Sequence, residues 1–237
     1  MKWLGVPMGL ALIAAPLVAC AGALLFGWFA VRLSGVYLAM LTLAFAQIVW
    51  ALVFQWEALT GGSNGVIGVW PPPPFDKTWV YFLLTLALAV TSVLLLRRFL
   101  FAPFGYAMRA GRDSPLRAEA IGIDVKRVHW LGFAVAGCVC GIAGGLFAFA
   151  KGSISPETIH VGRSIDGLVM VLLGGIQTLT GPIVGASVFA TLQDTVMRQT
   201  EYWRALLGII ILLLVLAFPQ GIVGAFSSFW RRMETKS

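Results

Sequence analysis

The sequence predicts an all-α polytopic membrane protein, with about five full transmembrane helices and a pair of short helices broken by glycine and proline. Of the 237 residues, 59% are hydrophobic and 11% are charged, and the mean hydropathy is +0.90. Several apolar runs are long enough to cross a bilayer. The basic residues gather in one loop between two of these runs and in the tail after the last run. A soluble globular protein of this length does not have this composition.

Five apolar runs account for the full spans. A helix needs about 20 apolar residues to cross the hydrocarbon core. The five runs are Met8 to Val31, Val36 to Trp56, Trp79 to Leu96, Leu131 to Ala150 and Ala205 to Val223. Tryptophans flank most of them, which is typical of the aromatic belts at membrane interfaces.

The stretch from Ile165 to Met197 is too long for one ordinary span. It is interrupted at Gly174-Gly175 and again at Gly181-Pro182. Proline removes a helical hydrogen bond and glycine weakens a helix, so we expect two short helices that meet inside the membrane; one long kinked helix is the alternative. Irregular backbone at that depth often lines a transport pathway. The pathway candidates are Gly174, Gly175, Gln177, Gly181, Pro182 and Gly185.

Charge predicts the orientation of the chain. The loop 97–130 holds seven of the 17 Lys and Arg residues, and the tail 225–237 is also basic. Positive loops stay in the cytoplasm, so both segments are expected inside. The same counting places Arg32 inside and the segments Glu57 to Lys77 and Lys151 to Arg163 outside. We expect residues 1–237 to form a single transmembrane domain.

A short helix, Pro115 to Ile121, is predicted inside the cytoplasmic loop. Ser114 can cap it, Pro115 loses nothing at the first helical position, and Gly122 can end it. Leu116 and Ala120 lie one turn apart on one side, which leaves Arg117 and Glu119 to face water or a partner. A capped amphipathic turn favours a docking surface over a plain solvated loop.

Enzyme motifs are absent. The chain has no paired carboxylates at membrane depth, no HExxH helix and no GxSxG elbow. Its cysteines and histidines are not spaced as metal ligands. We therefore expect no catalytic residue, and no metal or cofactor bound by this chain. The net charge of +7 follows from the topology and does not indicate nucleic-acid binding.

Several segments together resemble a known family. The loop RAGRDSPLRAEAIGIDVKRVHWLGFAVAG is followed by GIAGGLFAF and LVMVLLGGIQTLTGPIVGA, and preceded by RLSGVYLAMLTLAFAQIVWALV and LTGGSNGVIGV. Between Arg32 and Gly224 the chain resembles the permeases of branched-chain amino acid ABC importers of the LivM type. Members usually carry further helices upstream of the counterpart of Arg32, so we expect this chain to be short at its N-terminus.

The resemblance implies a multi-pass subunit in the bacterial inner membrane, with four partner polypeptides beyond the bilayer. These four polypeptides are of three kinds: a second related permease, two cytoplasmic ATPase subunits that bind ATP and Mg, and a periplasmic substrate-binding protein that meets the outer segments. The short helix would be the coupling helix of the ATPase. The coupling residues implied are Arg112, Ser114, Pro115, Leu116, Arg117, Glu119, Ala120 and Gly122.

Three readings stay open at this point. The first is an importer permease for branched-chain or related amino acids. The second is a permease of the same group for another solute, such as urea, a short amide or a sugar. The third is a truncated membrane subunit that binds partners without transporting. Pathway side chains would separate the first two, and their positions in space are not given by the sequence.

Overall fold

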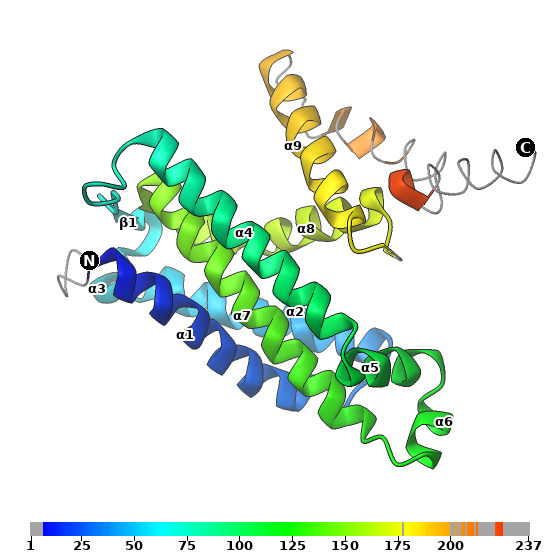
Figure 1. The fold of residues 1–237 in the computed structure, drawn as a ribbon. Coiled ribbons are helices and arrows are strands. Elements are labelled where there is room, and N and C mark those ends of the chain that lie inside the picture. The colour runs from blue at the N-terminus through cyan, green and yellow to red at the C-terminus, as the bar shows by residue number, and fades with distance from the viewer. Residues whose placement is uncertain are drawn as a thin grey trace, which may run out of the picture. The chain divides into compact units, whose positions relative to one another are not determined.

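The computed structural model describes residues 7–176, 178–199, 202, 205–206, 208–210, 212 and 221–224, in two compact units, 1–160 and 161–237. Unit 1 contains four helices that are long and apolar enough to cross a membrane (Figure 1). They are α1 (Met8–Ala30), α2 (Val36–Gln55), α4 (Thr78–Leu100) and α7 (Val125–Lys151). The all-α polytopic class and the first four predicted spans are confirmed. The fifth span, 205–223, falls largely outside the described residues, and the tail 225–237 wholly so.

Two of these helices extend further than hydropathy predicted. α4 continues to Leu100 and so includes Arg97 and Arg98 in its last turn. α7 begins at Val125, six residues before the predicted start, because Asp124 caps it and accepts a hydrogen bond from the Arg127 amide at 3.1 Å. Polar residues at a helix end lower the local hydropathy without ending the helix, so the apolar run is shorter than the helix.

The helices α1 and α7 pack closely through small residues. A Cβ atom at Gly141 would lie 2.6 Å from Cα of Pro16 and 2.8 Å from the carbonyl oxygen of Ala15. At Gly137, a Cβ would overlap the side chain of Ala23. Glycines spaced four residues apart on one face of α7 therefore let the two backbones approach, as small residues do between membrane helices.

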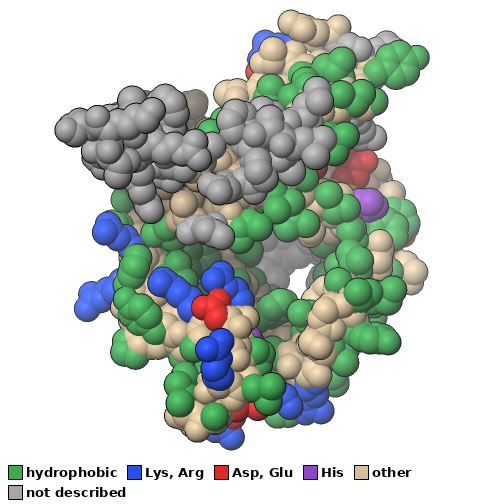
Figure 2. Space-filling view, turned by 90° about the vertical axis from the view of Figure 1, so that its right-hand side faces the viewer, with side chains coloured by type: hydrophobic (Ala, Val, Ile, Leu, Met, Phe, Trp, Pro, Cys, Tyr) green, Lys and Arg blue, Asp and Glu red, His purple; other side chains and the backbone are tan. Residues whose placement is uncertain are grey.

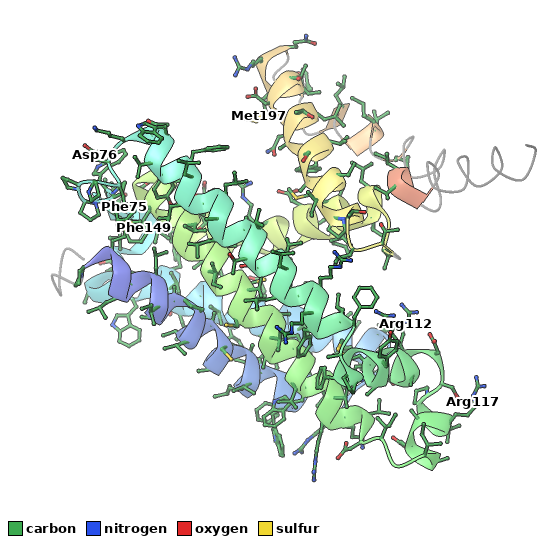
Figure 3. The ribbon with its side chains drawn as sticks, in the orientation of Figure 1. Phe75, Asp76, Arg112, Arg117, Phe149 and Met197 are labelled. Atoms are coloured by element: carbon green, nitrogen blue, oxygen red, sulfur yellow. The ribbon has the colours of Figure 1, made fainter. Side chains whose placement is uncertain are left out.

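The two predicted outer segments meet at one end of unit 1. Strands β1 (Val66–Ile67) and β2 (Ser153–Ile154) form a two-stranded antiparallel sheet, beside the short helices α3 (Glu57–Thr60), η1 (Gly62–Asn64) and η2 (Pro156–Ile159). The amides of Gly68 and Val69 donate to the carbonyl of Gly152, each at 3.0 Å. A small apolar cluster around Met8, Val69 and Phe149 lies beneath, with Phe75 against it (Figure 3).

Arg32 lies at the other end of unit 1. Its guanidinium carbon is 4.7 Å from the centre of the Trp28 ring, and Trp28 contacts Trp130, whose indole nitrogen donates to the Leu24 carbonyl at 2.8 Å. Trp130 precedes the apolar part of α7 and belongs to the basic loop region. The structure thus groups Arg32 with that loop and the two outer segments with each other, as the predicted topology requires.

Unit 2 contains the predicted broken pair. Helix α8 (Val161–Gly174) ends and helix α9 (Gly181–Gln199) begins at the two expected interruptions. α8 starts four residues before the predicted Ile165, within the segment expected to be an outer loop. Its first turns are polar, so the apolar run did not indicate where the helix begins. There Arg163 and Asp166, three residues apart, approach to 3.8 Å.

Candidate functional site

A sharp corner joins α4 to helix α5 (Pro103–Asp113), which the sequence analysis did not predict. Pro103 occupies the first turn of α5, where its missing amide costs nothing. A Cβ at Gly105 would overlap the Leu100 carbonyl, so only glycine permits this close approach. The same carbonyl accepts a hydrogen bond from Nη2 of Arg109 at 3.0 Å. Arg109 thereby ties α5 to the end of α4.

Helix α5 lies against the first turns of α7. A Cβ at Gly111 would be 3.0 Å from Cγ1 of Val125 and 3.5 Å from Cε1 of His129. One turn before Gly111 in α5, the Met108 side chain packs on Gly132 of α7. A Cβ at Gly132 would lie 3.0 Å from the Met108 sulfur. These contacts fix the direction in which the loop leaves the membrane-spanning helices.

The predicted short helix is present as α6 (Pro115–Ala120), one residue shorter than expected. Gly122 ends it in the left-handed conformation, with φ of +88°. The Gly122 amide donates to Glu119 and the Ile123 amide donates to Ala118, both at 3.0 Å. This pair of bonds is a Schellman motif, so the end of α6 is firmly defined.

Ser114 holds the predicted cap position, but its side chain makes no capping hydrogen bond. Its backbone serves both helices instead. The Ser114 amide donates to Ala110 of α5, and its carbonyl accepts from the amide of Ala118 in α6, both at 3.0 Å. The first turn of α6 is exposed, so water can satisfy the amides that a serine hydroxyl would have bonded.

The face that α6 turns toward the protein differs from the prediction. Ala118 is its buried residue, with 2% of its surface exposed. Leu116 is 82% exposed and Ile121 is 74% exposed, and Ala120 is exposed as well. The expected apolar side is thus directed outward and is covered by no described residue. Two large aliphatic side chains on so short a capped helix form an apolar projection.

Charged residues surround this projection. Arg112 pairs with Asp113 at 3.2 Å and Arg127 with Asp124 at 2.8 Å. Within the described part of the chain, neither Arg117 nor Glu119 forms an ion pair. Arg112 and Arg117 both point outward at this end of unit 1 (Figure 3). The α6 surface, defined here as Leu116, Arg117, Glu119, Ala120 and Ile121, therefore offers apolar and charged groups together.

The helix break in unit 2 is built from close backbone contacts at glycines. A Cβ at Gly174 would overlap the carbonyl of Gly181, and a Cβ at Gly185 would overlap the carbonyl of Met170. Residues 170 and 185 would be about 22 Å apart in one continuous helix. The alternative of a single kinked helix is therefore wrong, because α9 turns back and packs on α8.

Thr178 lies between the two helices, and its hydroxyl donates to the Gly175 carbonyl at 3.3 Å. Gly175 has φ of +110°, which favours glycine, and Pro182 occupies the first turn of α9. Leu173 and Phe189 form a buried pair below the break. Gln177, a predicted pathway residue, lies outside the described residues.

Gly221 also belongs to this contact, which the sequence analysis missed. Its φ is +75°, and a Cβ there would overlap the Gly175 backbone.

The α6 surface and the break lie in different units. The first is an exposed, capped projection, and the second is a close-packed turn. No group of three His, Cys, Asp or Glu residues that could hold a metal occurs among the described residues.

Comparison with known proteins identifies the family. The family model described as "Branched-chain amino acid transport system / permease component" matches residues 3–215, which include both the α6 surface and the helix break. The chain belongs to this permease family. The resemblance inferred from its segments is thereby confirmed.

Individual relatives agree with this family. The high-affinity branched-chain amino acid transport system permease protein LivM of Escherichia coli is 28% identical over 236 residues, covering 88% of this chain and 56% of the relative. A probable branched-chain amino acid transport permease protein LivH of Methanocaldococcus jannaschii is 26% identical, covering 68% of this chain and 50% of the relative. No solved structure matches the chain.

The chain is also similar to a permease named for another solute. The autoinducer 2 import system permease protein LsrC of Escherichia coli is 29% identical over 139 residues, covering 55% of this chain and 40% of the relative. The chain spans about half the length of the curated relatives it matches.

Proposed function

We propose that this chain is part of the membrane pathway of an ATP-driven importer for branched-chain amino acids. The full spans of unit 1 and the broken pair of unit 2 belong to the transmembrane permease, and ATP with Mg is bound and hydrolysed by a separate ATPase. The family match over residues 3–215 and the LivM relative support this proposal. The expected location is the bacterial inner membrane.

The α6 surface is the proposed contact with the ATPase. This assignment rests on one observation: a helix fixed at both ends presents Leu116 and Ile121 almost fully to the outside. Exposed apolar side chains rimmed by polar residues are typical of a contact with another protein. The Ser114 backbone bonds to both α5 and α6, and α5 lies against the start of α7. A push on α6 would therefore pass through α5 to a spanning helix.

The other proposed partners follow from the family and the fold. A second, related permease would complete the membrane-spanning pair. A periplasmic substrate-binding protein would meet the end formed by α3, β1 and β2, because these outer segments lie together at the end of α7 remote from α6. At about 1.5 Å per residue, the 27 residues of α7 separate the two ends by about 40 Å.

Altering the α6 surface should uncouple ATP hydrolysis from uptake. We expect Glu119→Lys and Ala120→Asp each to reduce ATPase copurification and ATP-dependent uptake by about tenfold or more, since charge placed within a docking surface costs about 2 kcal/mol or more. Membrane insertion should be unchanged, because both residues are exposed and lie outside the spanning helices. Copurification in detergent and uptake into vesicles measure the two effects.

Asp76→Lys is the matched control for Glu119→Lys. It makes the same charge change on an exposed carboxylate at the end of unit 1 remote from α6 (Figure 3). We expect the control variant to retain the ATPase fully. If the Glu119 and Ala120 variants also retain the ATPase and transport normally, the assignment of α6 as the docking element is wrong.

A permease for another solute is the second candidate, and the LsrC relative is the observation that favours it. The break at Gly174 and Gly181 would then have the same structural role, with different side chains facing the solute. Competition by unlabelled solutes in the uptake assay separates the candidates. Valine, leucine and isoleucine should compete under the first proposal, whereas urea, short amides or sugars would compete under the second.

A further inference from the structure

The basic loop has two chemically different halves. Between Arg97 and Arg112 the chain has four arginines, four aromatic residues and no acidic residue. Between Asp113 and Arg127 it has three basic and three acidic residues. The first half is the end of α4 with α5, and the second is α6 with the start of α7. The loop's excess positive charge therefore lies entirely in the half that adjoins α4.

This first half lies at the expected depth of lipid headgroups. α4 has 23 residues and is about 35 Å long. The hydrocarbon core is about 30 Å thick, so the last turn of α4, with Arg97 and Arg98, reaches the interface. Both arginines are exposed, and within the described part of the chain neither forms an ion pair. Their side chains can extend to phosphate groups without leaving the helix.

The aromatic residues at the same corner are also directed outward. Phe101 and Tyr106 are each 56% exposed. The guanidinium carbon of Arg109 lies 5.3 Å from the centre of each ring. Exposed aromatic rings beside arginine at a membrane boundary are typical of the headgroup layer, where the ring enters the apolar edge and the charge meets phosphate. Figure 2 shows Lys and Arg side chains beside hydrophobic ones on the face of unit 1 that carries α5 and α6.

We propose that the α4–α5 corner, defined as Arg97, Arg98, Phe101, Tyr106 and Arg109, binds the headgroups of anionic phospholipids in the leaflet that faces the loop. The occupant follows from charge: the corner has no acidic residue to compensate its arginines, and basic residues adjoining a span attract anionic lipid. α6 projects from the neutral half. The loop thus separates a lipid-binding corner from a protein-docking helix.

The experiment measures lipid retention and requires neither ATP nor transport, so it is independent of the proposed function. The chain is purified in neutral detergent with equimolar phosphatidylglycerol and phosphatidylcholine of identical acyl chains, and the retained lipids are quantified by mass spectrometry. We expect enrichment of phosphatidylglycerol. Arg97→Gln with Arg98→Gln should reduce this enrichment about 5- to 30-fold, since each arginine near an anionic surface contributes roughly fivefold.

Two further variants control for net charge and folding. Arg117→Gln with Lys126→Gln removes the same two charges from the neutral half and should leave enrichment within about twofold, because only charge close to the membrane surface attracts its lipid. Arg97→Lys with Arg98→Lys keeps the charge and should keep the enrichment.

Three results would overturn the proposal. The first is equal retention of both lipids by the unaltered chain. The second is the same loss in both double glutamine variants, which would indicate a general charge effect. The third is unchanged lipid retention in the Arg97 and Arg98 glutamine variant. If that variant instead releases a copurifying ATPase, the corner binds protein.

Discussion

Gly185→Leu is expected to abolish transport and to prevent α8 and α9 from packing. A Cβ at Gly185 overlaps the Met170 carbonyl and lies 2.7 Å from the Gly174 amide nitrogen, so the obstacle is backbone and cannot rotate away. Overpacking a core usually costs about 1–3 kcal/mol through side-chain movement. Here two helix backbones must separate, and we expect the free energy of unfolding to fall by more than that range.

Gly167→Leu is the matched control for this prediction. Gly167 lies in α8, and no atom is within 4 Å of the position where its Cβ would be. We expect the control to insert and transport normally. Uptake and resistance to unfolding by sodium dodecyl sulfate should be measured for both variants. Normal uptake by Gly185→Leu would show that the close contact at the break is not required for the pathway.

Gly141→Val is expected to produce the second large effect, by separating α1 from α7. A Cβ at this position would lie 2.6 Å from Cα of Pro16 and 2.8 Å from the Ala19 side chain. The valine methyl groups would extend further into α1. We expect the free energy of unfolding to fall by about 1–3 kcal/mol, measured by titration with sodium dodecyl sulfate.

Gly144→Val provides the comparison on the same helix. A Cβ at Gly144 meets nothing within 4 Å, and substitutions at such open positions usually change stability by less than about 0.5 kcal/mol. The two variants add the same side chain to the same helix and differ in whether it faces α1. Equal stability of both would mean that α1 and α7 do not pack as described.

Much of the fold was predictable because the signals are local. Apolar runs gave the first four spans, since the bilayer sets their length. Proline at position 115 and glycine at position 122 gave the short helix α6, because each residue restricts its own backbone. The glycines at 174 and 181 gave the break between α8 and α9 for the same reason. None of these predictions required knowledge of which segments meet in space.

The parts that the sequence analysis missed depend on contacts between distant segments. The pairing of β1 with β2 brings together residues 66 and 154, and no periodicity indicates such a pair. The predicted inward face of α6 was wrong, because Ala118 packs inward while Leu116, Ala120 and Ile121 are exposed. Helix α5 carried a usable signal, Pro103 at a first turn, but its position on α7 depends on Gly111 and Met108 meeting their partners.

ATP-dependent uptake of labelled leucine tests the central claim most directly. The chain would be reconstituted into vesicles with the proposed partners, which are a second permease, ATPase subunits and a binding protein. Uptake would be compared with that of the Glu119→Lys complex. We predict uptake that requires ATP and the binding protein, that valine and isoleucine inhibit, and that the variant loses. The proposal would be contradicted by an assembled complex that hydrolyses ATP but accumulates none of the three amino acids. If the unaltered chain does not assemble at all, the result would favour a subunit that does not transport.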